Sequence, residues 1–385
     1  MVIGVFTSLS GVGGIQQFSR HAGAVLQEVA QTRGHSSALF SLNDAPGVHS
    51  FSVGAASYSF RGFGRRKAGL FAALARLAPK LELAYLGHSN LAPLGMPLRL
   101  LHPRLRYWVV AHGVEVWEPL SLLRRWGLRR AHLITAVSAD TAERMAKAQG
   151  LDPRRIVLLP PALEPGFAAL SSSQAPRGVP AGSRVVLSVG RMIASEPGKG
   201  FDTVIRAMPQ ILRSVPECFY VVVGDGDDRN RLERLAEEHQ VAKRVLFAGE
   251  QTAEELKRHY SRCDVFAMPS RQEGFGIAYL EAMAFGKPVV GGKQGGTSEC
   301  VRDGRTGFLI EYDCPDVLAE RLIQLLQDEH LRSTMGELGR RSVEENFSFE
   351  QFRRKLSRLL PGDHPVDDEH RVEDATAGSR QVAKP

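Results

Sequence analysis

The chain has 385 residues, of which 43% are hydrophobic and 24% charged, and these are the proportions of a soluble globular protein. Its length favours two domains, and no apolar run reaches the roughly 18 residues that a membrane-spanning helix needs. The net charge of +7 is uneven, with 20 lysines and arginines against 9 acidic residues in residues 1–180 and 29 against 33 in the rest. The basic half is therefore expected to meet an anionic partner.

Strand and helix patterns alternate through the first half. Ser138 is expected to cap a helix over residues 139–149, which Gly150 ends. A second helix is predicted over 15–33, where apolar residues recur at helical spacing. Strands are predicted at residues 2–7, 37–42, 83–88, 107–112 and 133–137. This alternation indicates βαβ units and a parallel sheet.

A turn-rich stretch rich in proline and serine, roughly residues 160–183, interrupts the pattern before it restarts. The second half is predicted to contain strands at 184–189, 220–223, 245–247, 265–268 and 288–290, and helices at 201–215, 228–240, 254–262, 274–285 and 315–328. The predicted fold class is α/β, with two doubly wound, Rossmann-like domains at 1–165 and 183–346. The polar residues 361–385 are expected to be disordered.

The cysteines and the N-terminus bear on the cellular compartment. Cys218, Cys263, Cys300 and Cys314 show neither CxxC spacing nor histidines at ligand spacing, so we predict reduced structural cysteines. Residues 1–6 form a buried-strand pattern without the basic region of a signal peptide. A cytoplasmic location is therefore predicted. Separately, no nucleic acid is expected as a partner.

The most informative motif is Glu273-Gly-Phe-Gly-Ile-Ala-Tyr-Leu-Glu281, which follows a predicted strand and opens a helix. If the helix begins near Phe275, backbone N–H groups around Gly274, Gly276 and Ile277 remain accessible to an anion. Carboxylates bind vicinal hydroxyls, so Glu273 and Glu281 fit a sugar attached to a phosphate. Two ordinary surface glutamates are the alternative.

Cations and glycines follow other predicted strands. Arg191 leaves a strand end and Lys199 lies between two glycines before a helix, an arrangement that suits a diphosphate. Gly13-Gly14 precedes the first helix but lacks GxGxxG spacing, and no acidic residue is assigned to the end of a second strand. His112 ends a predicted strand and is followed by a glycine. Both a ligand-binding role and a structural role are open for this histidine.

Two further motifs have competing interpretations. The stretch Asp225-Gly-Asp-Asp228 resembles a DxD metal motif, but a turn followed by a helix N-cap explains it, and no metal is expected. Basic clusters at 61–67 and 124–130 adjoin apolar residues at helical spacing. They suit either contact with an anionic membrane surface or ordinary helices whose apolar side chains pack inward while the basic side chains face solvent.

Taken in order, these motifs resemble the retaining GT-B glycosyltransferases of family 4 over essentially residues 1–360. The matching elements include Gly13-Gly14-Ile15, His112-Gly113, Gly190-Arg191, Lys199-Gly200, the Glu273–Glu281 motif and Gly295-Gly296. The resemblance implies two domains facing across a cleft, with residues 347–360 crossing back onto the N-terminal domain. It implies a nucleotide-sugar as substrate and neither a cofactor nor a metal.

The resemblance also implies a role for each site residue. Arg191 and Lys199 would hold the donor diphosphate, and Glu273 would contact the transferred sugar beside backbone N–H groups of residues 274–277. Glu281 would bind the ribose hydroxyls. His112 would meet the sugar near the reacting carbon, and Gly13-Gly14 would approach the phosphate.

The predicted activity is hexosyl transfer from GDP-mannose or UDP-glucose to a saccharide or polyprenyl-diphosphate-linked saccharide, in cell-surface or exopolysaccharide assembly. The basic N-terminal half would contact the acceptor and an anionic membrane, which gives a peripheral location on the inner membrane face. A soluble acceptor is the alternative within this class. A non-catalytic nucleotide-sugar-binding protein and a nicotinamide dehydrogenase are the alternatives outside it.

Overall fold

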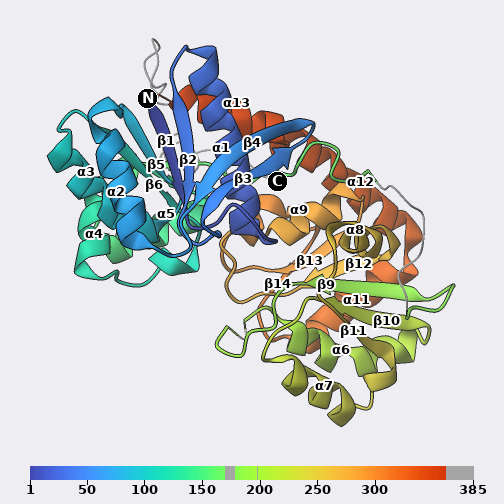
Figure 1. The fold of residues 1–385 in the computed structure, drawn as a ribbon. Coiled ribbons are helices and arrows are strands. Elements are labelled where there is room, and N and C mark those ends of the chain that lie inside the picture. Colours follow the sequence, from blue (N-terminus) through green and yellow to red (C-terminus); the bar gives the residue numbers. More distant parts are fainter. Residues whose placement is uncertain (170–177, 197, 361–385) are drawn as a thin grey trace, which may run out of the picture. The chain divides into compact units, whose positions relative to one another are not determined.

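The computed structural model describes residues 1–169, 178–196 and 198–360 (Figure 1). The chain forms two compact units, one of residues 1–165 together with the chain from Ser348, and the other of residues 166–347. The predicted tail at 361–385 and part of the predicted linker lie outside the described residues. Among the described helices, none is both long and apolar enough to cross a bilayer.

The first unit is built on an eight-stranded sheet in the order β3-β4-β2-β1-β5-β6-β7-β8. Its strands are β1 (Val2–Phe6), β2 (Ser37–Ser41), β3 (Gly47–Val53), β4 (Ala56–Gly62), β5 (Leu83–Leu86), β6 (Arg106–Ala111), β7 (Leu133–Ala136) and β8 (Ile156–Leu158). Its helices are α1 (Gly14–Thr32), α2 (Lys67–Leu77), α3 (Gly95–Leu101), α4 (Leu122–Arg129), α5 (Ala139–Gln149) and α13 (Phe349–Leu359). The order reverses between β1 and β5, and all pairs but β3–β4 are parallel.

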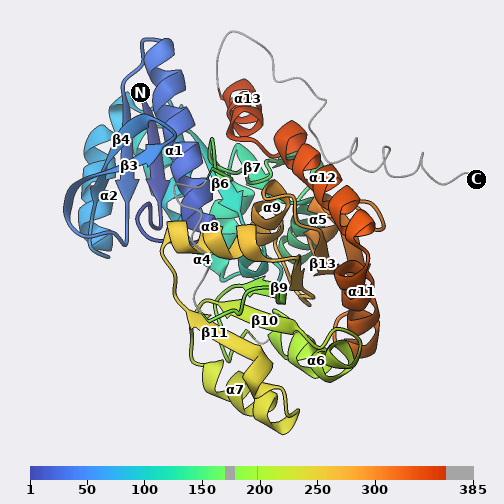
Figure 2. The ribbon, with the colours of Figure 1, turned by 90° about the vertical axis from the view of Figure 1, so that its right-hand side faces the viewer.

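Helices cover both faces of this sheet (Figures 1 and 2). Buried leucines of α2 and α3 join the core on one face, and α1 packs on the other. The last described helix, α13, returns to α1, where the Phe352 and Phe18 rings meet edge to face at 5.2 Å and Arg33 donates to the carbonyl of Leu360. These contacts fix the closing helix within the first unit.

The second unit contains a parallel six-stranded sheet in the order β11-β10-β9-β12-β13-β14. Its strands are β9 (Arg184–Val189), β10 (Cys218–Val223), β11 (Val245–Gly249), β12 (Val265–Met268), β13 (Val289–Gly292) and β14 (Gly307–Ile310). Its helices are α6 (Phe201–Ser214), α7 (Arg229–Glu238), α8 (Ala253–Arg262), α9 (Ile277–Ala284), α10 (Thr297–Cys300), α11 (Pro315–Gln327) and α12 (Glu329–Asn346). Helices α6, α7 and α11 share one core.

Most predicted elements form, and local capping explains the sharpest boundaries. The Ser138 hydroxyl accepts the N–H of Thr141 at the start of α5, and Gly150 ends the helix with a φ of 61°. One prediction was wrong: α9 begins at Ile277 rather than near Phe275, because Gly276 precedes it with a φ of 92°. The Phe275 side chain is consequently buried against Phe347.

Candidate functional site

The strand order reverses between β9 and β12, and both strands lead into the predicted site. Open α/β sheets place ligands beyond the carboxyl ends of the strands at such a reversal. Arg191 and Lys199 lie in the loop from β9 to α6, and Glu273 lies in the loop from β12 to α9. The Arg271 N–H donates to the carbonyl of Gly198 at 2.7 Å, so the two loops are joined by a backbone hydrogen bond.

The structure brings Lys199 and Glu273 together. Lys199 Nζ lies 2.6 Å from Glu273 Oε2, and the side chains are 29% and 14% exposed. An ammonium group has three N–H donors, so the contact with Glu273 uses only part of its capacity. This pair places a cation and a carboxylate side by side, which is a suitable arrangement for a phosphate joined to a sugar.

Two glycines allow the backbone to take this shape around Glu273. Gly276 occupies the left-handed region, where a Cβ would lie 2.3 Å from the ring of Tyr279. Gly295 has a φ of 80°, and a Cβ there would lie 2.5 Å from the carbonyl oxygen of Glu273. The N–H of Gly296 donates to that same carbonyl at 2.8 Å. The Gly295-Gly296 motif therefore supports the Glu273 loop through close backbone contact.

Glu281 lies on α9 and is held by a residue that the sequence analysis missed. The buried Tyr260 of α8 donates its hydroxyl to Glu281 Oε2 at 2.7 Å, and its ring stacks on Phe285 at an interplanar angle of 13°. Burial, reinforced by the charge of Glu281, raises the pKa of Tyr260 well above its usual value. Tyr260 therefore remains a neutral donor, and Glu281 is half-buried with one oxygen fixed.

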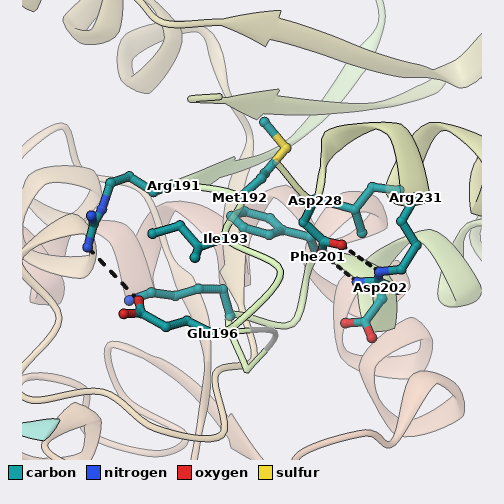
Figure 3. Close-up of a pocket in the computed structure, with 10 residues that line it drawn as sticks. Arg191, Met192, Ile193, Glu196, Phe201, Asp202, Asp228 and Arg231 are labelled. Carbon is teal, nitrogen blue, oxygen red and sulfur yellow. Dashed lines mark hydrogen bonds and ion pairs between the residues drawn. The ribbon is translucent and has the colours of Figure 1, made fainter. Parts of the chain in front are cut away.

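Arg191 extends from the end of β9 into solvent. Its side chain is 79% exposed, and its guanidinium lies 4.0 Å from the Glu196 carboxylate. Figure 3 marks this ion pair by a dashed line. Nearby, Arg231 forms two hydrogen bonds of 2.7 Å to Asp228, and both residues line the same shallow hollow as Arg191. A long exposed arginine with a distant partner can reorient toward a diphosphate at little cost.

The DxD-like stretch is engaged in the β10–α7 turn. The Asp227 carboxylate accepts the N–H of Ala194, and that of Asp225 accepts the N–H of Gly226, each at 2.8 Å. Asp228 precedes α7 but pairs with Arg231 instead of capping the helix with its side chain, so that part of the prediction was wrong. Within the described ranges, no group of three or more His, Cys, Asp or Glu side chains is arranged to hold a metal ion.

The first unit holds the glycine loop and His112. Gly13 precedes α1 without a side-chain cap. The prediction that no acidic residue follows the second strand was wrong, because Asp44 lies just beyond β2 and its carboxylate accepts the N–H of Leu9 at 2.7 Å. Although burial opposes ionisation, hydrogen bonds from Leu9, Ser41 and Ser8 lower the pKa of Asp44. Asp44 thus anchors the loop that leads to Gly13-Gly14.

His112 immediately follows β6 and is half-buried. Its Nε2 lies 2.9 Å from the carbonyl oxygen of Gly87, so this nitrogen carries the proton and Nδ1 is the acceptor. Burial lowers the pKa of His112 although Glu115 and Gly87 act in the opposite direction. The ring of His88 lies 5.5 Å away; this histidine also follows a strand end, which was the signal available to find it.

The comparisons with known proteins identify the family. The profile described as Glycosyl transferases group 1 matches residues 172–342, and the one described as Glycosyltransferase Family 4 matches residues 12–167. A GDP-mannose-dependent alpha-(1-6)-phosphatidylinositol monomannoside mannosyltransferase of Mycolicibacterium smegmatis is 36% identical over 289 residues, covering 69% of this chain and 74% of that protein. The chain belongs to the family 4 (group 1) glycosyltransferases.

Other relatives agree with this assignment. A D-inositol 3-phosphate glycosyltransferase of Nocardia farcinica is 33% identical over 221 residues, covering 54% of this glycosyltransferase and 48% of its relative. The structure of Anabaena HepE in complex with UDP and glucose matches with a TM-score of 0.74 at 20% identity, covering 94% and 99% of the two chains. WaaG, a glycosyltransferase involved in lipopolysaccharide biosynthesis, matches with a TM-score of 0.66 at 20% identity, covering 94% and 100%. These structures establish the GT-B fold.

Proposed function

We propose that this glycosyltransferase moves a hexosyl group from a nucleotide-sugar to an acceptor hydroxyl with retention of the anomeric configuration. The observation that carries the proposal is the contact of Lys199 with Glu273 at the point where the strand order reverses. Lys199 and Arg191 would bind the diphosphate, Glu273 the sugar hydroxyls and Glu281 the ribose hydroxyls. His112 would contact the transferred sugar near its reacting carbon, and Gly13-Gly14 would contact the phosphate.

The reaction breaks the bond between the anomeric carbon and the diphosphate oxygen and forms a bond from that carbon to the acceptor oxygen. Negative charge grows on the departing diphosphate, where the cations of Lys199 and Arg191 stabilise it. The acceptor proton passes to a leaving phosphate oxygen on the same face of the sugar, so atoms and charge balance. In this scheme Glu273 positions the sugar and is not a nucleophile, and its short contact with Lys199 suits that role.

GDP-mannose is the donor that we favour, because the mycobacterial relative is named as GDP-mannose-dependent. UDP-glucose is the second candidate, since the Anabaena structure was solved with UDP and glucose. A thermal-shift panel of nucleotide-sugars separates them, because a ligand at 100 times its Kd adds roughly 2.7 kcal/mol of stability. Proton NMR of the product then reports the anomeric configuration. Stabilisation without turnover by any acceptor would favour the non-catalytic alternative.

We favour a lipid-linked saccharide or inositol acceptor that reaches the first unit at a membrane surface. The supporting feature is α4, where Leu122 and Leu123 are 83% and 69% exposed and Trp126 is partly exposed. The three arginines of α4 are hydrogen-bonded within the first unit: Arg124 donates to the Ser89 hydroxyl, and Arg125 and Arg129 donate to the carbonyl of Gln149. Exposed leucines and a tryptophan beside basic residues suit a bilayer interface.

The other basic cluster does not offer such a surface. Leu70 and Leu74 of α2 are fully buried in the core of the first unit, so the apolar stripe that follows residues 61–67 packs inward. Of the two basic clusters, we therefore propose α4 as the membrane contact. A soluble acceptor stays the alternative within the class, and flotation with vesicles, described below, distinguishes the two.

A further inference from the structure

A cavity of about 460 Å³ lies in the first unit, and none of its lining residues belongs to the proposed donor site or to α4. Its floor consists of apolar side chains from α1, β1, β5 and the end of α13: Val2, Leu26, Val29, Ala30, Leu83 and Leu360. The volume falls in the range of pockets that hold small organic ligands, roughly 300–1,000 Å³. Strands β1, β5 and β6 run parallel, and the cavity lies beside their first residues. His112 follows the last residue of β6, so the cavity is at the opposite end of these strands from His112.

The rim of the cavity is strongly basic. Arg104 and Arg106 are exposed, and they line the cavity together with Arg33, His35 and His102. The one acidic lining residue, Glu82, already contacts the amino group of Met1 at 2.8 Å and His35 at 3.2 Å. Its charge is therefore compensated, and the excess at the rim is positive.

A histidine near the cavity lies among arginines of the same end of the strands. His132, which accepts the N–H of Tyr107 beside the first residue of β6, has a pKa that burial lowers and that the charges of Arg99, Arg106 and Arg155 lower further. The residues that we propose to bind the nucleotide-sugar belong mainly to the other unit.

We propose that this cavity binds an amphiphile with a phosphate head and a single apolar chain. The head would contact Arg104 and Arg106, since guanidinium groups bind phosphate through paired charge-assisted hydrogen bonds. The chain would cover the apolar floor, whose burial from water supplies a favourable contribution that grows with chain length. The site is separate from the proposed donor site and does not depend on it.

Isothermal titration calorimetry on the full chain tests the proposal, with octyl phosphate below its micelle concentration as probe. We expect saturable 1:1 binding that weakens at least tenfold for butyl phosphate and for octanol, with inorganic phosphate weaker still. Inorganic phosphate binding as tightly as octyl phosphate would show a plain anion site and overturn the amphiphile assignment. Absence of saturable binding by octyl phosphate would overturn the site itself.

Paired variants locate the binding. The double variant Arg104→Ala/Arg106→Ala should weaken octyl phosphate at least tenfold. The control Arg76→Ala/Lys147→Ala removes the same charge from exposed positions that do not line the cavity, and it should bind like the parent chain. Equal weakening in both variants would mean that net charge, and not this cavity, is responsible. Circular dichroism confirms that each variant is folded before titration.

Discussion

Replacing Tyr260 by Phe tests whether Glu281 depends on a fixed orientation to bind the ribose. The substitution removes only the hydroxyl that donates to Glu281 Oε2 at 2.7 Å and keeps the ring stacked on Phe285. No cavity is created, so packing should be preserved. The variant therefore isolates one hydrogen bond to a carboxylate that is half-buried.

The expected magnitude follows from the type of bond. Hydrogen bonds to charged groups contribute about 1.5–3 kcal/mol, and partial exposure of Glu281 lets water replace some of this, which favours the lower end. A loss of about 1.4 kcal/mol corresponds to a tenfold weaker Kd. The nucleotide should therefore bind up to about tenfold more weakly to the variant, with the deficit confined to ligands that carry ribose hydroxyls.

The assay compares GDP with its 2′-deoxy and 3′-deoxy analogues by calorimetry on the parent chain, on Tyr260→Phe and on Tyr220→Phe. Tyr220 is a fully buried tyrosine of the same unit that donates to Ser188 at 2.9 Å, which makes it a matched control. The parent and Tyr220→Phe should discriminate against the deoxy analogues, and Tyr260→Phe should discriminate less. Equal discrimination by all three proteins would refute the role of Tyr260. No discrimination by the parent would instead refute the contact of Glu281 with ribose.

Three further predictions concern stability, metal and membrane. Burial lowers the pKa of His21 from 6.5 to about 3 in the folded chain. Between these two pH values the unfolded chain binds a proton that the folded chain does not bind. The free energy of unfolding should therefore fall as the pH decreases from 6.5 toward 3. Urea unfolding between pH 5.5 and 4.5 should show a pH slope that is smaller by about 1.4 kcal/mol per unit in His21→Phe, and an unchanged slope would contradict this. Excess EDTA should leave the transfer rate unchanged, because the proposal assigns charge stabilisation to side chains; a loss that Mg²⁺ restores would overturn that assignment. Flotation with anionic vesicles should decrease in Leu122→Ser/Leu123→Ser, and equal flotation of parent and variant would argue against α4 as the contact.

Local signals predicted most of the fold. The α5 boundaries follow from Ser138 and Gly150, and both act through bonds to neighbouring residues. The β3–β4 hairpin was not predicted, although Gly54 forms its two-residue turn with a φ of 58° and apolar residues alternate on both sides. That signal was present in the sequence. The surrounding βαβ pattern predicts parallel strands, whereas this hairpin adds an antiparallel strand, β3, to the end of the sheet.

The site was predictable in part, and the limit is the range of its interactions. The motif containing Glu273 and the loop containing Lys199 are each visible in sequence, but only the fold shows that their side chains meet. Tyr260 precedes Glu281 by 21 residues in an ordinary helix, so no local pattern indicates their hydrogen bond. The position of Asp44 just after a predicted strand is visible in the sequence. Its partner, the main chain of the loop that leads to Gly13-Gly14, is visible only in the structure.

The central claim is that Lys199 stabilises the departing diphosphate of a nucleotide-sugar. Its most direct test is kcat for GDP-mannose-dependent transfer in the parent chain, in Lys199→Ala and in Lys243→Ala, an exposed lysine at the amino end of β11. Removing one group that stabilises developing negative charge typically costs about 10²–10³ in kcat, and we predict a loss of this size for Lys199→Ala with the control unaffected. A Lys199→Ala enzyme that is folded and turns over at the parent rate would contradict the account.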